Sequence, residues 1–253
     1  MIRRSALILA LSLTAAVAAA DGSLIPLTPD QDQAQAGATL LRGATTLTLY
    51  QRPDAEPLRL TIDARQIGSY EDPVVASWPA DADTPLRSVS VEPGDSGALE
   101  LPGADPGPVQ VLLDTGQNAA AVACNGPLGI PAATDQPAHF IIRVGTLHFF
   151  VPDGAERFTV FARGQGSEEN VKLTVMTPDG DEAGSATSIG SQGAELRVGV
   201  PPEHAGAIWS LTAGRADTGV FEDCSIGLSR ELPQYLSLRP DGVLVPFVTG
   251  LGQ

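Results

Sequence analysis

The sequence predicts an all-β protein made of two β-sandwich domains, of jelly-roll or immunoglobulin-like type, behind a cleaved signal peptide. Long helical patterns are absent, and short apolar alternations recur between Gly, Pro, Asp and Asn residues. Such spacing is typical of sandwiches and barrels. The 27 Gly and 21 Pro residues mark turns between these segments.

The first 20 residues predict export. Arg3 and Arg4 precede an apolar run over 6–13, and the small residues Ala18 and Ala20 suit signal peptidase. We expect cleavage before Asp21 and a mature protein that is secreted or periplasmic. The later apolar run 140–151 contains Arg143 and His148, so no membrane insertion is expected after cleavage.

The chain is strongly acidic. Its 15 Lys and Arg face 30 Asp and Glu, a net charge of −15, which becomes −17 when Arg3 and Arg4 leave with the signal peptide. Nucleic acids and anionic membranes need cationic side chains, so both are disfavoured as partners. Self-repulsion between acidic surfaces favours a monomer.

The first domain is expected over 21–125. Leu47-Thr48-Leu49-Tyr50 and Leu58-Arg59-Leu60-Thr61-Ile62 alternate with period two, as half-buried strands do. The same criterion predicts strands at 38–41, 45–50, 58–63, 86–91, 98–101, 109–113 and 119–124.

A segment rich in Pro, Gly and Ala at 126–137 is expected to be a linker. The second domain follows over 138–253 and ends in an extended tail. Two Pro-Asp-Gly turns, at 152–154 and 178–180, separate its strands, and the second turn predicts a hairpin. Strands are predicted at 140–144, 146–151, 157–162, 171–176, 182–186, 195–200, 207–211 and 220–228.

Part of this second set resembles a known kind of module. The stretch Leu147-His148-Phe149-Phe150-Val151-Pro152-Asp153-Gly154, and later Val171-Lys172-Leu173-Thr174-Val175 with Pro178-Asp179-Gly180, are the residues that carry the resemblance. They are similar to the pre-peptidase C-terminal type and to β-sandwich carbohydrate-binding modules, over roughly 138–228. The resemblance implies attachment or support instead of chemistry, although no catalytic domain accompanies the module here.

Catalytic motifs do not emerge from the residues. Gly94-Asp95-Ser96-Gly97 matches the sequence around the nucleophile of chymotrypsin-like proteases. In those proteases the catalytic His precedes the Ser, whereas His139, His148 and His204 all follow it here, so a turn explains the four residues better. Nucleophile elbows, zinc-binding helices and phosphate-binding glycine loops are absent from the sequence. We therefore expect a non-enzyme. The alternative left open is a small secreted hydrolase that uses a carboxylate pair, which the sequence does not identify.

Two kinds of ligand site are expected. Asp179, Asp181 and Glu182 offer hard oxygen ligands at a hairpin turn, and calcium takes six to eight such oxygens. The alternative is a turn with solvated charges.

Trp78, with Tyr70 nearby in a loop-rich stretch, is the candidate platform for stacking a sugar ring, whereas Trp209 is expected in the core.

Cys124 and Cys224 leave two readings open. A disulfide between them would join segments 100 positions apart and stabilise the fold by about 4–5 kcal/mol. We favour two buried thiols, because each cysteine is expected in a different domain.

These observations predict an exported, non-catalytic binding or supporting module of the cell envelope or extracellular space. A glycan or an envelope protein is the expected partner. Exposed loops of the second sandwich are the expected place for a ligand, because loops on a rigid scaffold commonly carry binding groups.

Overall fold

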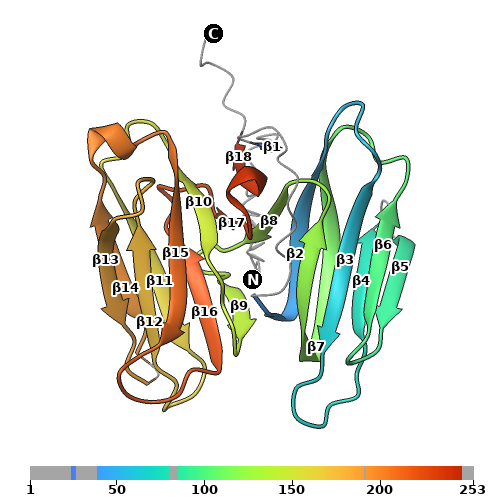
Figure 1. Cartoon of the computed structure of the whole chain (residues 1–253), viewed down its shortest axis with the longest axis horizontal. Coiled ribbons are helices and arrows are strands. Elements are labelled where there is room, and N and C mark those ends of the chain that lie inside the picture. Colours follow the sequence, from blue (N-terminus) through green and yellow to red (C-terminus); the bar gives the residue numbers. More distant parts are fainter. Residues whose placement is uncertain (1–23, 27–38, 80–84, 191, 247–253) are drawn as a thin grey trace, which may run out of the picture.

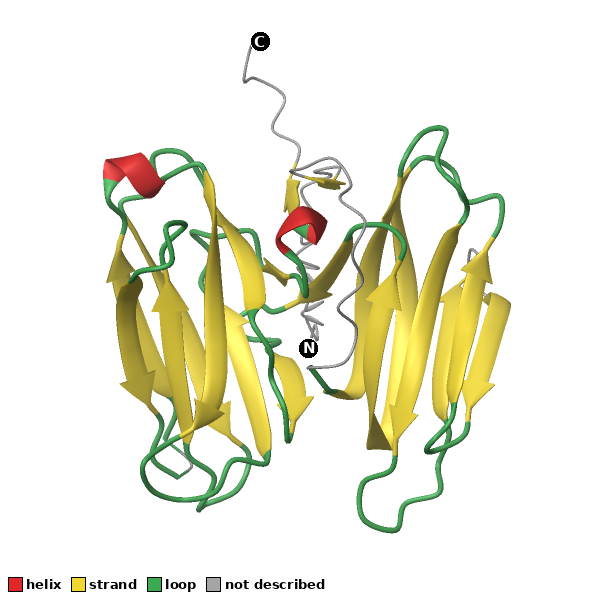
Figure 2. Ribbon diagram, in the orientation of Figure 1, coloured by secondary structure: helices red, strands yellow, loops and turns green. Residues whose placement is uncertain are grey.

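The computed structural model describes residues 24–26, 39–79, 85–190 and 192–246, and these form strands with two short 3₁₀ turns (Figures 1 and 2). The turns are η1 (Pro202–His204) and η2 (Pro240–Gly242). The prediction of an all-β fold is confirmed. The predicted signal peptide, residues 1–20, lies outside the described residues.

The first half of the chain forms two facing layers. Strand β3 shows why: its side chains alternate between buried and more exposed positions, so one face lies on the core. The strands are β2 (Leu41–Gln51), β3 (Leu58–Arg65), β4 (Val74–Pro79), β5 (Pro85–Val91), β6 (Ser96–Leu101) and β7 (Gly107–Cys124).

Strand β7 belongs to both layers because it bends in the middle. Before the bend it pairs with β2 and β4, and after the bend, from Ala119 on, it pairs with β3 and with the first residues of β2. Strand β2 has a register shift opposite this bend, where Gly43 has a φ of +78°. One layer therefore runs β5–β4–β7–β2, and the other runs β6–β3–β7–β2, since the first residues of β2 belong to the second layer.

Two fully buried polar side chains hold this bend. The Thr115 hydroxyl accepts a hydrogen bond from the Gly43 amide and donates one to the Asn118 carbonyl oxygen. The Asn118 amide group donates to the carbonyl oxygens of Tyr70 and Asp72, while its oxygen accepts from the Ile67 amide. The bend and the β3–β4 connection are thereby fixed to each other, and the buried polar atoms have partners.

The second half forms a second pair of layers. Strands β10, β15, β12 and β13 make one sheet, in that order, and β14, β11, β16 and β9 make the facing one. Their bounds are β9 (Ala138–Ile141), β10 (Leu147–Val151), β11 (Arg157–Gly164), β12 (Val171–Met176), β13 (Glu182–Thr187), β14 (Ala194–Gly199), β15 (Ala207–Arg215) and β16 (Asp223–Leu228).

Both layers continue across the seam between the halves. In one layer, β9 pairs with β2 through Phe140 and Leu41. In the other, β8 (Leu128–Pro131) pairs with β2 on one side and with β17 (Tyr235–Leu236) on the other. Ser237, directly after β17, then exchanges both backbone hydrogen bonds with His148 of β10.

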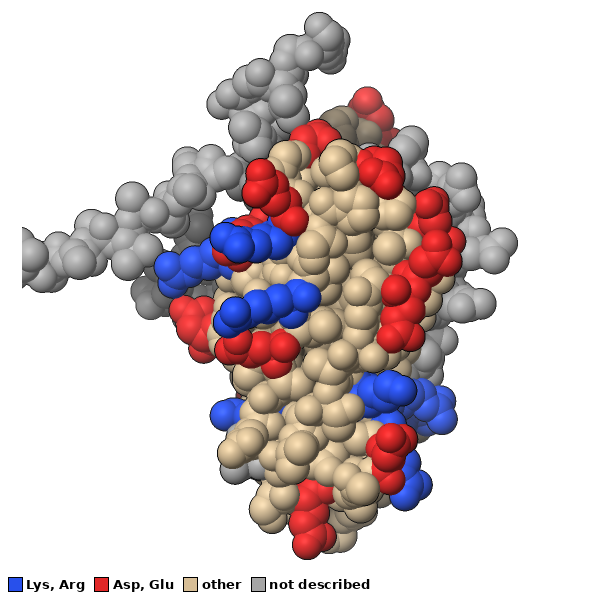
Figure 3. Space-filling view, turned by 90° about the vertical axis from the view of Figure 1, so that its left-hand side faces the viewer, with Lys and Arg blue, Asp and Glu red and all other residues tan. Residues whose placement is uncertain are grey.

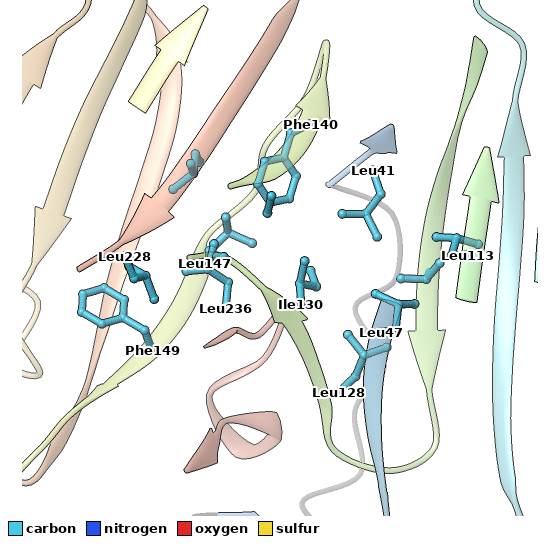
Figure 4. Close-up of a cluster of buried hydrophobic side chains, with 14 of the residues drawn as sticks. Leu41, Leu47, Leu113, Leu128, Ile130, Phe140, Leu147, Phe149, Leu228 and Leu236 are labelled. Atoms are coloured by element: carbon cyan, nitrogen blue, oxygen red, sulfur yellow. The ribbon is translucent and has the colours of Figure 1, made fainter. Parts of the chain in front are cut away.

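One hydrophobic core extends through both halves. Figure 4 shows its central part, where side chains from β2, β7, β8, β9 and β10 meet between the sheets. The predicted linker 126–137 thus contains strand β8 and the buried side chains of Leu128, Ile130 and Ala132. That the two halves fold as independent domains stays a prediction.

Two short strands near the chain ends lie at the seam. Strand β1 (Leu24–Pro26) pairs with β18 (Leu244–Pro246) between the two halves (Figure 1). Strand β1 contacts β2 and β7, and β18 contacts β10. We call β1, η2 and β18 the terminal clasp. In the described ranges, no helix is both long enough and apolar enough to cross a membrane.

Candidate functional site

Three loops of the second half gather at one end of its sandwich. Val151, the last residue of β10, lies opposite Ala207, the first of β15, and Met176 at the end of β12 lies opposite Ser210. The β10–β11, β12–β13 and β14–β15 connections therefore share this end. We call it the acidic loop end, after its exposed carboxylates Asp153, Glu156, Asp179, Asp181, Glu182 and Glu203.

Figure 3 looks onto the outer side of this sandwich. Acidic side chains gather toward the upper end of this face, the end at which η1 lies in Figure 1. Because these like charges lie close together, the electrostatic potential at this end is more negative. This end of the molecule is therefore suited to a cationic or hydrogen-bond-donating ligand.

The two Pro-Asp-Gly turns form as the sequence predicts. Gly154 and Gly180 have φ angles of +76° and +88°, which glycine adopts without strain. In the second turn, the Gly180 amide donates to the Thr177 carbonyl oxygen and the Thr177 amide donates to that of Asp181. The predicted hairpin, β12 to β13, is confirmed.

Each turn presents its Asp to the third loop. Asp179 contacts His204 of η1, with 3.0 Å between Oδ2 and Nε2. Asp153 lies against Gly206, where a Cβ atom would come within 2.1 Å of Oδ1. The β14–β15 loop is thus held between two carboxylates, one from the β12–β13 hairpin and one from the β10–β11 connection between the sheets.

His204 is the least exposed ionisable side chain at the acidic loop end. Its side chain is 16% exposed, against 73% for Asp179. The ring packs edge-on against Trp209, and the Trp209 indole N–H donates to the His204 carbonyl oxygen at 2.9 Å. The Nδ1 atom is buried and has no hydrogen-bond partner. Trp209 itself is in the core, as predicted.

The predicted calcium ligands are close in sequence but exposed. Asp179, Asp181 and Glu182 follow one another around the β12–β13 turn. Within the part of the chain that the structure describes, no group of three or more His, Cys, Asp or Glu side chains is arranged to hold a metal ion. A calcium ion at this turn stays a prediction.

The two residues of the predicted aromatic platform, Trp78 and Tyr70, lie toward opposite ends of strand β4. Trp78 alternates with the buried Val74 and Ala76, so it packs against the core at the end of β4. Tyr70, 46% exposed, precedes the other end of the strand. Val74 and Trp78 alone are about 13 Å apart at the usual rise of a strand, so the two rings do not form one surface.

The two cysteines are not joined to each other. Cys124 ends β7 opposite Leu60 of the first half, and Cys224 lies in β16 opposite Phe140 of the second. Burial, together with the nearby carboxylates of Asp223 and Glu169, raises the pKa of Cys224 to about 12. The structure thus has the second arrangement that the sequence left open, two buried cysteines in different halves.

The protease-like residues 94–97 cover the end of the β5–β6 turn and the first two residues of β6. Gly94 has a φ of +92°, and the Asp95 amide donates to the Glu92 carbonyl oxygen. The Ser96 hydroxyl contacts the Asp63 carboxylate at 3.3 Å. Local turn chemistry therefore explains these residues, as expected.

Sequence reasoning missed the grouping of Asp153 and His204 with Asp179. The available signal was the repeated Pro-Asp-Gly turn, which places an Asp at the same point of two connections. No protein-family model and no curated protein matches this sequence.

Proposed function

We propose that this chain is an exported, non-catalytic binding or supporting module of the cell envelope or extracellular space. The acidic loop end takes the ligand, a glycan or an envelope protein, and the fused sandwiches hold it at a fixed distance from the first half. The mature protein works as a monomer, without nucleic acid and without inserting into a membrane.

The observation that carries this proposal is the single core through both halves. The buried side chains of Leu41, Ile130 and Phe140 belong to one cluster at the seam. Packed interiors resist deformation, so the two sandwiches cannot move independently without exposing apolar surface. Such a body suits support and presentation.

Rigidity can be measured between spin labels at Asp105→Cys and Asp181→Cys, exposed positions in the first and second halves. We expect one narrow distance distribution, since both native cysteines are buried. A broad or two-peaked distribution would contradict the proposed support role.

Binding can be measured by thermal unfolding of residues 21–253 with soluble polysaccharides, with calcium and with a chelator. A ligand that binds only the folded state raises the midpoint. The rise should disappear in Asp179→Asn and persist in Asp105→Asn, a matched change at an exposed carboxylate of the first half.

The same experiment separates the alternatives. A rise that survives Asp179→Asn places the ligand elsewhere and overturns the proposed site. Release of reducing sugar from any of these polysaccharides would overturn the non-catalytic assignment and favour the carboxylate-pair hydrolase.

A further inference from the structure

Strand β14 is an open edge of the larger sheet. Within the described ranges it pairs with β11 alone, and it lies at the outer end of the second sandwich (Figure 1). Its register with β11 runs through six residue pairs without a shift, and its sequence contains no proline. Bulges and prolines are among the devices that keep an edge strand from pairing with another chain. The open side of β14 is therefore regular enough to accept a further strand.

The backbone groups of Glu195 and Arg197 face this open side. On β11, the Thr159 amide donates to the Ser229 hydroxyl and the Thr159 carbonyl oxygen accepts from the Ser229 amide, so both groups point away from β14. Residues opposite each other in an antiparallel pair exchange both hydrogen bonds or neither. Arg197, opposite Thr159, therefore turns its amide and carbonyl groups to the open side, and Glu195, two residues earlier, does the same.

The side chains of β14 carry a self-complementary pattern. Glu195 and Arg197 lie on the outer face of the sheet, 60% and 82% exposed, with 3.6 Å between Oε2 and Nη2. Leu196 between them is half-buried on the inner face, beside Gly184 of β13. One acidic and one basic side chain thus flank an apolar centre.

A second copy of β14 fits this edge in one register. In an antiparallel pair with its two-fold axis at Leu196, each Glu195 lies opposite the partner's Arg197. The same register sets Gly193 opposite the partner's Gly199, where no side chains meet. Moving the axis by one residue sets Glu195 opposite the partner's Glu195, or Arg197 opposite the partner's Arg197, and like charges directly opposite are unfavourable. Moving it by half a residue sets open-side backbone groups opposite inward-facing ones, so the ladder cannot form.

We propose that β14 is a pairing surface for a second copy of this chain, with the two-fold axis at Leu196. The amide and carbonyl groups of Glu195 bond with those of the partner's Arg197. The two Leu196 side chains, on Cα atoms about 4.5 Å apart, cover each other. The sheet then continues from one copy into the next, as it continues from β9 into β2 at the seam.

This pairing goes beyond the proposed function and requires concentrated chains. The net charge of −15, or −17 without Arg3 and Arg4, repels a second copy at a distance, so the dilute protein remains the monomer proposed above. The edge acts only on contact, where opposite charges meet. On a crowded envelope surface it links neighbouring support modules side by side.

Sedimentation equilibrium of residues 21–253 between about 1 μM and about 1 mM tests the proposal. We expect a reversible equilibrium between monomer and dimer. Glu195→Arg sets an arginine opposite the partner's Arg197 and should weaken the dimer by about tenfold or more, even though the chain becomes less acidic. Combining it with Arg197→Glu restores opposite charges and should restore the dimer. Asp105→Arg, an equal change of charge at an exposed position of the first half, should not weaken it.

Disulfide trapping tests the register without the double exchange. Leu196→Cys places two thiols across the axis at a Cα separation that suits a disulfide, so mild oxidation should give a covalent dimer, whereas Asp105→Cys should not. The native cysteines are buried and do not interfere. A native chain that stays monomeric throughout, a folded double exchange that stays monomeric, an undiminished dimer in Glu195→Arg, or equal trapping at both cysteine positions would each overturn the pairing.

Discussion

Leu41 of β2 and Phe140 of β9 face each other across the seam between the two sandwiches, each no more than 2% exposed. Their pairing makes one sheet continue from the first half into the second. The Leu40 amide donates to the Arg143 carbonyl oxygen and the Ile141 amide donates to that of Leu40, which extends the contact. The seam is thus a part of the core and not a hinge.

Phe140→Ala tests the role of this pair. Removing a fully buried phenylalanine destabilises a fold by about 3–5 kcal/mol, from lost burial and the cavity left behind. We expect such a loss in urea unfolding, with both halves still unfolding in one transition. Phe161→Ala, at a half-buried position on the outer face of β11, is the control and should have a clearly smaller effect.

Separate expression of residues 21–125 tests whether the first half folds alone. This fragment lacks β8 and β9, so the strand edges and the apolar side chains of Leu41 and Leu49 that they pair with or cover are exposed. We expect an unfolded or aggregating fragment by circular dichroism and gel filtration. A cooperative unfolding transition in the fragment would instead support two independent domains.

Asn118→Ala tests the polar bend of β7. The change leaves the Ile67 amide and two carbonyl oxygens without a buried partner, and each unsatisfied group costs about 1–3 kcal/mol. We expect reduced stability in urea and faster proteolysis in the β3–β4 connection. Gln117→Ala, at the exposed neighbouring position, should change neither.

Gly206→Ala tests the close approach of Asp153. Gly206 has a φ of +68°, and a Cβ atom there would come within 2.1 Å of the Asp153 carboxylate. We expect a loss of about 1 kcal/mol or more in thermal unfolding. Gly103→Ala is the matched control because Gly103 has a φ of +78° while a Cβ atom there has open space. An equal effect at both positions would contradict the close approach.

Cys224 should be chemically inert in the folded protein. A rise in its pKa from 9.0 to about 12 lowers the thiolate fraction by about a thousandfold, and only the thiolate reacts. In a Cys124→Ala background, Ellman's reagent at about pH 8 should label Cys224 only after guanidinium chloride is added. Rapid labelling of the folded protein would show that the thiol is neither buried nor shifted.

The sequence predicted most strands because their side chains alternate. The pattern Leu58-Arg59-Leu60-Thr61-Ile62 has one face for the core, and β3 occupies that place. Strand β4 was not predicted, since its few apolar residues lie between Pro73 and Pro79. The 109–113 and 119–124 segments were predicted as two strands, whereas they form the single strand β7 with Asn118 buried at their junction.

Strand β8 illustrates a different limit. Leu128 and Ile130 are spaced for one face of a strand, but Gly126, Pro127 and Pro131 surround them and favour a linker. The strand forms because β2 and β17 pair with it from both sides. Pairing between segments far apart in the sequence supplied what local preference did not.

The sequence by itself determined the all-β class, the two Pro-Asp-Gly turns and the acidic charge, because alternation, positive φ at glycine and ionisable groups are local properties. Only the tertiary structure decided that the two sandwiches share one core, that Trp78 and Tyr70 lie apart, and that Asp179 meets His204. Each of these depends on which strands pair and in which register, and that choice is made by the burial of side chains from the whole chain.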